Sequence, residues 1–161
     1  MEESGMVLDE ARRHLATLGP LAKKLNAASD EFTEELRMIE AELGKLNLGL
    51  EAMLPHPMVF GDLKDEADWD TQETKSYCCN SYLAYGRGGK EWMLLVRTFR
   101  DYEDANRNET RSVLMSETPL LGASRDLRMA AADQIEELLK LIADEANAKI
   151  DSLKKVIDKK K

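Results

Sequence analysis

The chain contains few residues whose types and spacing suit catalysis or metal binding. His14 and His56 are far apart in the sequence, and no histidine, cysteine or acidic spacing resembles a zinc site. Cys78 and Cys79 are adjacent, and neighbouring residues of a strand point to opposite faces. They predict a core thiol beside an exposed one, with a redox pair as the alternative. We therefore predict no catalytic residue, no metal and no cofactor, and a protein that is not an enzyme.

Two segments resemble ligand-binding loops only in composition. Residues 86–90, Gly-Arg-Gly-Gly-Lys, are glycine-rich and basic, but a helix N-terminus follows a phosphate loop, whereas an extended segment follows here. Residues 62–73 are acidic, but they lack the central glycine and the ligand order of a calcium loop. We interpret the first segment as a hairpin turn and the second as a solvated acidic loop.

Arginine alternates with aromatic residues between positions 81 and 111. The candidate partner-binding residues are Tyr82, Tyr85, Trp92, Arg97 and Arg100. Such a mixture can stack on single-stranded nucleic acid, contact another protein or pack within a sheet. The formal net charge of −8 repels phosphates and anionic lipids, so we expect neither nucleic acid nor a membrane as a partner. Protein binding and simple sheet packing remain as alternatives.

One apolar stripe organises the first third of the chain. Its members recur three and four residues apart, an average spacing of 3.5 residues that keeps one helix face against a partner helix. They are Leu8, Ala11, Leu15, Leu18, Ala22, Leu25, Ser29, Phe32, Leu36, Ile39, Leu43, Leu46, Leu50 and Met53, of which only Ser29 is polar. Gly19-Pro20 interrupts this helix and predicts a kink or, as the alternative, a reversal of the chain.

The chain is predicted to form a single domain of four consecutive segments. These are an N-terminal coiled-coil helix over residues 1–54 with a break at 19–20, an acidic connection over 55–75, a β head over 76–117 and a C-terminal helix over 118–161. Within the head, Gly88-Gly89 predicts a hairpin turn, because both positions tolerate positive φ. Residues 111–116 predict a third strand. Thr118-Pro119 is a candidate helix cap followed by a first helical residue, and Ser124 is a second candidate cap.

These segments predict an α+β fold, mostly helical, in which long antiparallel coiled-coil helices flank a small two- to three-stranded antiparallel sheet. The first stripe is longer than the last helix, and the excess corresponds to residues 8–18. A buried leucine stabilises by about 1.5–3 kcal/mol, so this excess calls for a partner. We predict self-association through Leu8, Ala11, Leu15 and Leu18, with a fold-back at Gly19-Pro20 as the alternative.

The order of helix, β-hairpin and helix resembles the architecture of prefoldin subunits, in which β-hairpins join an antiparallel helix pair. This resemblance implies a holdase chaperone as one hypothesis. The favoured hypothesis is a non-enzymatic coiled-coil scaffold that self-associates, as a dimer or larger oligomer, and binds another protein. A third is a small ligand-binding or enzymatic domain with a site around His56 and Asp62–Asp70. The acidic N-terminus lacks the apolar segment of a signal peptide, so we expect a cytoplasmic protein.

Overall fold

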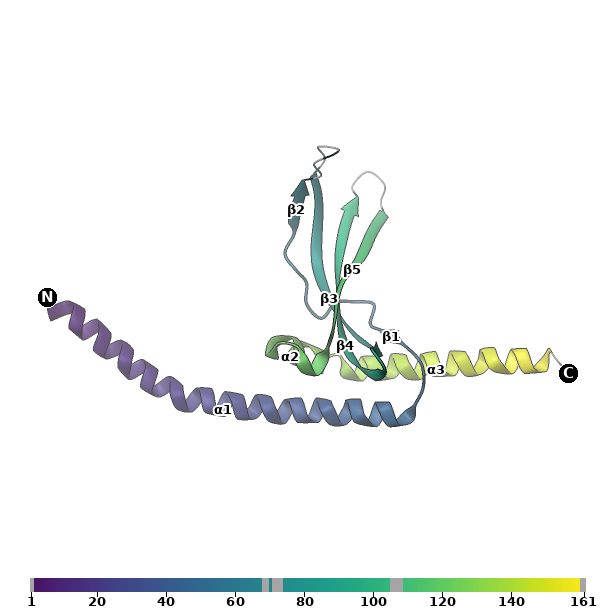
Figure 1. The fold of residues 1–161 in the computed structure, drawn as a ribbon, viewed down its shortest axis with the longest axis horizontal. Coiled ribbons are helices and arrows are strands. Elements are labelled where there is room, and N and C mark those ends of the chain that lie inside the picture. The colour runs from purple at the N-terminus through teal and green to yellow at the C-terminus, as the bar shows by residue number, and fades with distance from the viewer. Residues whose placement is uncertain (1, 68–69, 71–73, 105–108, 160–161) are drawn as a thin grey trace. The chain divides into compact units, whose positions relative to one another are not determined.

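The computed structural model describes residues 2–67, 70, 74–104 and 109–159 (Figure 1). Contacts divide the chain into two compact units, an N-terminal unit, Met1–Ile39, and a C-terminal unit, Glu40–Lys161. Helix α1 (Glu2–Leu46) provides the N-terminal unit, and its last turns belong to the C-terminal unit. We describe each unit in turn.

Helix α1 is one continuous element through Gly19-Pro20, so the alternative reversal of the chain is absent. The predicted kink is compatible with a continuous helix that contains a proline. A proline inside a helix removes one backbone hydrogen bond and costs roughly 3 kcal/mol. Residues 9–28 are all exposed, so water can bond the carbonyl that Pro20 leaves without a helical donor. The apolar periodicity therefore predicted correctly that the helix continues across this pair.

Two residues with positive φ, Asn47 and Gly49, end α1 earlier than the sequence predicts. Asn47 has a φ of 47° and Gly49 a φ of 64°, a left-handed conformation that terminates helices. Residues after Gly49 then become extended, and Ala52 and Leu54 are buried in the C-terminal unit. The Leu54 amide donates to the Leu83 carbonyl at 3.0 Å. Met53, the last member of the apolar stripe, therefore lies in a short strand rather than in a coiled-coil helix.

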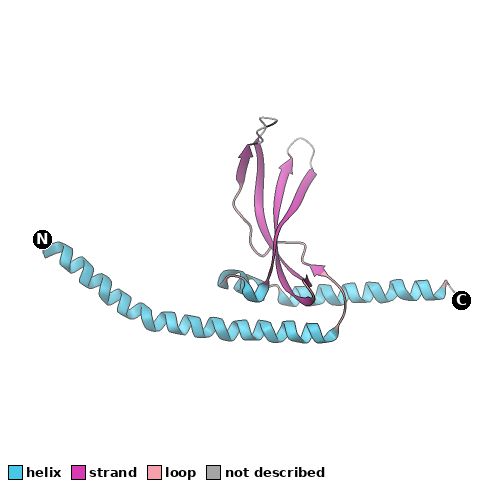
Figure 2. Ribbon diagram, viewed as in Figure 1, coloured by secondary structure: helices cyan, strands magenta, loops and turns pink. Residues whose placement is uncertain are grey.

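The C-terminal unit contains a five-stranded antiparallel sheet (Figure 2). Its strands are β1 (Ala52–Met53), β2 (Lys64–Ala67), β3 (Thr74–Gly88), β4 (Glu91–Asp104) and β5 (Glu109–Pro119). The order is β1-β3-β4-β5, and β2 also pairs with β3. Because β4 occupies one edge of β3, β1 and β2 share its other edge at different positions along the strand. Val59 adds a bridge to Ser81 between them.

The β3–β4 hairpin confirms the central sequence prediction. Gly88 pairs with Glu91, and Gly89, with a φ of 72°, begins the two-residue turn, one position later than predicted. Strand β5 confirms the third strand and is longer than the predicted 111–116. The register between β4 and β5 shifts at Thr98/Phe99, a β-bulge. Such a bulge twists an edge strand and hinders further sheet pairing.

The predicted C-terminal helix is divided into three elements, η1 (Leu120–Gly122), α2 (Arg125–Ala132) and α3 (Ile135–Asp158). The predicted cap is confirmed, because the Leu127 amide donates to the Ser124 hydroxyl at 3.3 Å. A short break at residues 133–134 separates α2 from α3. The four-residue spacing from Ala131 to Ile135 continues across this break, which is why periodicity alone did not reveal it.

The core lies where the inner half of the sheet meets the C-terminal helices. Helix α3 packs against β1 and β3, and η1 packs against β4 (Figure 1). The buried apolar residues that these elements supply are Ala52, Leu54, Leu83, Ala84, Tyr85, Leu94, Leu95, Val96, Leu120, Ala131, Ile135, Leu138 and Ile142. The outer ends of β2–β5 extend away from α2 and α3 (Figure 2).

The predicted fold class is wrong. The sheet has five strands rather than two or three, because the 50–67 region supplies two strands to the free edge of β3. The long helices do not flank a small sheet as an antiparallel coiled coil. Instead, α3 leaves the second half of its apolar stripe exposed, including Ile150, Leu153 and Ile157. The resemblance to prefoldin subunits depended on a small sheet between two long helices, and the five-stranded sheet departs from that pattern.

Candidate functional site

The N-terminal unit presents an apolar helix face to solvent. Leu15, Leu18, Leu21 and Leu25 are 65%, 54%, 57% and 55% exposed, and Ala11 is also exposed. The side chain of Leu8, the fourth predicted self-association residue, lies outside the described residues. We call the apolar face of residues 11–29 the α1 seam. Leu21 and Leu25 were missed as self-association residues. Leu21 is not a member of the stripe, and Leu25 was expected to be covered by the C-terminal helix.

Charged side chains lie away from the α1 seam. In the heptad frame of the stripe, the flanking positions are Arg12, His14, Gly19, Leu21, Asn26 and Ala28. Arg12 forms an ion pair with Asp9 of the preceding turn, at 3.3 Å. The remaining charges, among them Lys23 and Lys24, lie on the outer face of the helix. A second helix can therefore approach this face without meeting a row of charge.

The predicted partner-binding residues do not form one surface. Tyr85 is 1% exposed, and its ring stacks on Trp92 with centroids 5.7 Å apart. Burial raises the pKa of Tyr85, and the nearby carboxylate of Glu40 raises it further. Glu40 also accepts the Leu94 amide at 2.8 Å, next to the end of the β4–β5 pairing. Tyr85 and Trp92 thus contribute to the sheet's packing, in agreement with the packing alternative.

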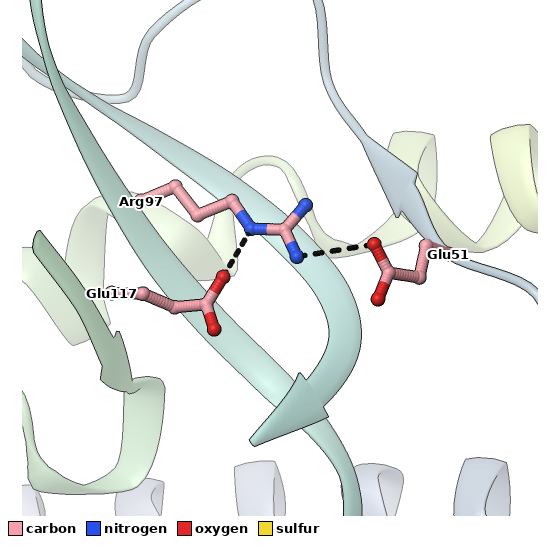
Figure 3. A network of polar contacts seen from close by, with 3 residues as sticks. All are labelled: Glu51, Arg97 and Glu117. Carbon is pink, nitrogen blue, oxygen red and sulfur yellow. Dashed lines mark hydrogen bonds and ion pairs between the residues drawn. The ribbon is translucent and has the colours of Figure 1, made fainter. Parts of the chain in front are cut away.

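Arg97 of β4 joins β5 and the residue that precedes β1 (Figure 3). Its Nε donates to Glu117 of β5 at 2.6 Å, and its Nη2 donates to Glu51, just before β1, at 3.3 Å. The side chain is only 16% exposed. Burial lowers the pKa of Arg97, but the bonds to both carboxylates outweigh it and raise the pKa. These contacts give Arg97 a structural role, with little of its guanidinium left for a partner.

Arg100 lies on the opposite face, in an aromatic cluster. Its guanidinium carbon is 4.3 Å from the centroid of Tyr77, and its Nη1 is 3.3 Å from the Tyr102 hydroxyl and 3.4 Å from Glu66. The hydrogen bond with Tyr102 is the main cause of a raised pKa for Arg100. An odd separation in a strand places Arg97 and Arg100 on opposite faces, a signal that was already present in the sequence.

Asp101 is the centre of a hydrogen-bond network that sequence reasoning missed. Its carboxylate accepts from Asn80 at 2.7 Å, Ser112 at 2.6 Å and Tyr82 at 3.3 Å. Asn80 in turn accepts the Gly61 amide at 3.2 Å. Burial, followed by the charge of Asp101, raises the pKa of Tyr82. The network joins β3, β4, β5 and the β1–β2 connection, segments whose proximity no local pattern reveals.

The alternative site around His56 and residues 62–70 is divided in the structure. His56 Nε2 lies 3.1 Å from Glu137 on α3, whereas Asp65 accepts the Ser76 hydroxyl at 2.7 Å on the outer sheet. Residues 68–69 of the predicted site lie outside the described residues. Cys78 and Cys79 are both free and half-buried. Among the described residues, no group of three histidine, cysteine or acidic side chains is placed to hold a metal ion.

Comparisons with known proteins identify no family for this chain. No family model, curated protein or solved structure matches the chain. Every helix in the described part of the chain is too short or too polar to cross a lipid bilayer. Functional inference therefore depends on the surfaces themselves, among them the α1 seam, whose four leucines are each more than half exposed.

Proposed function

We propose that this chain is a non-enzymatic interaction protein that self-associates through the α1 seam. The observation that carries the proposal is the exposure of Leu15, Leu18, Leu21 and Leu25 on one helix face. Contiguous apolar patches of this kind are typical of protein–protein interfaces. A single exposed leucine would need no explanation, but four within eleven residues of one helix do.

The energetics of an isolated helix support a partner. Most helical stability in proteins comes from packing of an apolar face rather than from intrinsic propensity. Fully burying a leucine stabilises by about 1.5–3 kcal/mol, and roughly half of that remains available to a side chain that is about half exposed. Covering four such leucines therefore offsets part of the cost of association.

A second copy of this chain is the partner that the sequence pattern favours. The stripe alternates three and four residue steps, the spacing of a helix that packs on another helix of the same kind. The positions that flank it from His14 to Thr33 carry no acidic or lysine side chain, so two copies bring no like-charged rows together. Charges such as Lys23 and Glu31 remain on the outer faces.

Two matched double variants test this proposal by light scattering. L18E/L25E places two carboxylates in the α1 seam, and we expect it to reduce the particle to the 18.2 kDa monomer. A16E/A27E places the same charges on the outer face, where both alanines are exposed, and should keep the wild-type mass. Association through the α1 seam would be contradicted if L18E/L25E had the same particle mass as the wild type. It would also be contradicted if L18E/L25E and A16E/A27E both had a lower particle mass.

A further inference from the structure

Leu21 is an exposed leucine that the regular stripe does not explain. It is 57% exposed and precedes Ala22, one of the small members of the stripe. In the heptad frame it is a flanking position rather than a core position. An arrangement of two helices that covers Leu21 as well as the stripe would account for all four exposed leucines between positions 11 and 29.

We infer that two copies of α1 pair antiparallel, with the two-fold axis between the helices at the level of Pro20. The inference builds on the proposed self-association and specifies its geometry. In this register Ala11 faces Ser29 of the second copy, Leu15 faces Leu25, and Leu18 faces Ala22. The same contacts then repeat in reverse order, as in any interface that uses one surface twice. The paired segment is the α1 seam, whose residues are exposed through Ala28.

Packing distinguishes this register from a parallel one. The antiparallel pair places each Leu18 against the small Ala22, and it brings Leu21 against Leu21 of the second copy beside that small layer. The parallel pair would place Ala22 against Ala22, which leaves a void, and Leu21 beside the polar Asn26. Interiors are close-packed, and cavities are destabilising. Only the antiparallel register gives the exposed Leu21 an apolar neighbour.

Charge is compatible with the antiparallel register. The flanking positions place Arg12 beside Asn26 of the second copy and His14 beside Ala28. No pair of like charges meets along either flank between Ala11 and Ser29. At the centre of one flank, Gly19 faces Gly19 of the second copy. Neither residue has a Cβ atom, so the two backbones can approach each other closely there. At Gly19 the surrounding space in one copy is open.

Cysteine cross-linking tests the orientation. In a C78S/C79S background, A11C and S29C are made separately, with tags of different mass. Residues 11 and 29 are about 27 Å apart along a helix at 1.5 Å per residue. We expect a disulfide-linked pair only when the A11C and S29C proteins are mixed. Cross-linking of A11C with itself would indicate a parallel pair and overturn the inference.

A charge exchange provides a second test that retains both native cysteines. L21E alone and L21K alone should each weaken self-association, because like charges meet at the two-fold axis. Their mixture should restore the wild-type particle mass through a Glu–Lys pair. In a parallel pair residue 21 lies beside residue 26, so mixing would restore nothing, and this result would overturn the antiparallel register.

The outcomes separate the inference from the proposed function. A wild-type chain that stays monomeric contradicts the self-association and the register together. A wild-type oligomer that L18E/L25E dissociates supports the α1 seam, and the cross-links then decide the orientation. An oligomer that gives no mixed A11C–S29C cross-link and no recovery from mixed L21E and L21K contradicts the antiparallel register alone.

Discussion

At the scale of single residues, the sheet depends on backbone approaches that a side chain would block. A Cβ atom on Gly61 would lie 2.2 Å from the carbonyl oxygen of Cys79. A Cβ atom on Gly86 would lie 2.9 Å from Nη2 of Arg97. The first glycine lets the β1–β2 connection approach β3, and the second leaves space for the ion pairs of Arg97 with Glu51 and Glu117. Both are spatial demands that sequence spacing does not reveal.

Replacing Gly61 by alanine should destabilise the C-terminal unit. The added methyl group meets backbone atoms of Cys79 rather than a flexible side chain, so β3 or the β1–β2 connection must move. This movement weakens the hydrogen bond from the amide of residue 61 to Asn80. We expect a loss of about 1–3 kcal/mol in the free energy of unfolding, measured with urea. G122A is the matched control, because nothing lies within 4 Å of that position. Equal stability of the two variants would contradict this role for Gly61.

Tyr82 should make stability depend on pH in the alkaline range. Burial and Asp101 raise its pKa above the usual 10.0, so the folded state retains a proton that the unfolded state loses first. The resulting stability is complete below pH 10 and falls as the pH rises through the folded-state pKa. Y82F removes this titration, so its unfolding free energy should decline less than that of the wild type above pH 10. If the unfolding free energies of Y82F and the wild type declined equally above pH 10, this role for Tyr82 would be contradicted.

At the scale of elements, the hairpin turn and the Ser124 cap were predicted correctly, whereas strands β1 and β2 were not predicted. The hairpin turn at Gly89 and the cap at Ser124 depend on backbone conformation and on one nearby hydrogen bond, which sequence types reveal. Strand β2, Lys-Asp-Glu-Ala, is fully exposed and has no apolar alternation. It forms because β3 offers free backbone groups. Its pairing partner is therefore set by tertiary structure rather than by its own residues.

The sequence predicted only part of the α1 seam, because tertiary structure decides which apolar residues are covered. Periodicity identified Leu15 and Leu18 as surplus apolar surface. It assigned Leu25 to an intrachain partner because α2 and α3 were taken for one long helix that could cover it. Leu21 falls outside the stripe, so spacing alone excluded it. Exposure, which depends on what the rest of the chain covers, adds both residues to the seam.

Replacing Pro20 by alanine tests the continuity of α1. Pro20 lies on the outer face of the heptad frame, so its removal changes no seam contact. Alanine restores a helical hydrogen bond and should stabilise α1, with a ceiling of roughly 3 kcal/mol. We expect a higher midpoint for the thermal loss of helical circular dichroism and tighter self-association. P55A, outside any helix, is the control, and an unchanged P20A midpoint would contradict a continuous helix.

At the scale of the whole molecule, the two units differ in how much apolar surface they bury. The C-terminal unit buries residues from the sheet, α2 and α3. The N-terminal unit exposes every described side chain from residue 9 to residue 28. An exposed apolar helix face can gain stability by packing against another molecule. Self-association is the claim on which the proposed function and the helix register both depend.

Sedimentation equilibrium of the unmodified chain over a wide concentration range tests that claim most directly. Mass action requires the average mass to rise with concentration if the seam is covered by a second copy. We predict a rise from 18.2 kDa towards twice that value, with the transition displaced to higher concentration in L18E/L25E. A mass of 18.2 kDa at every concentration would contradict the account.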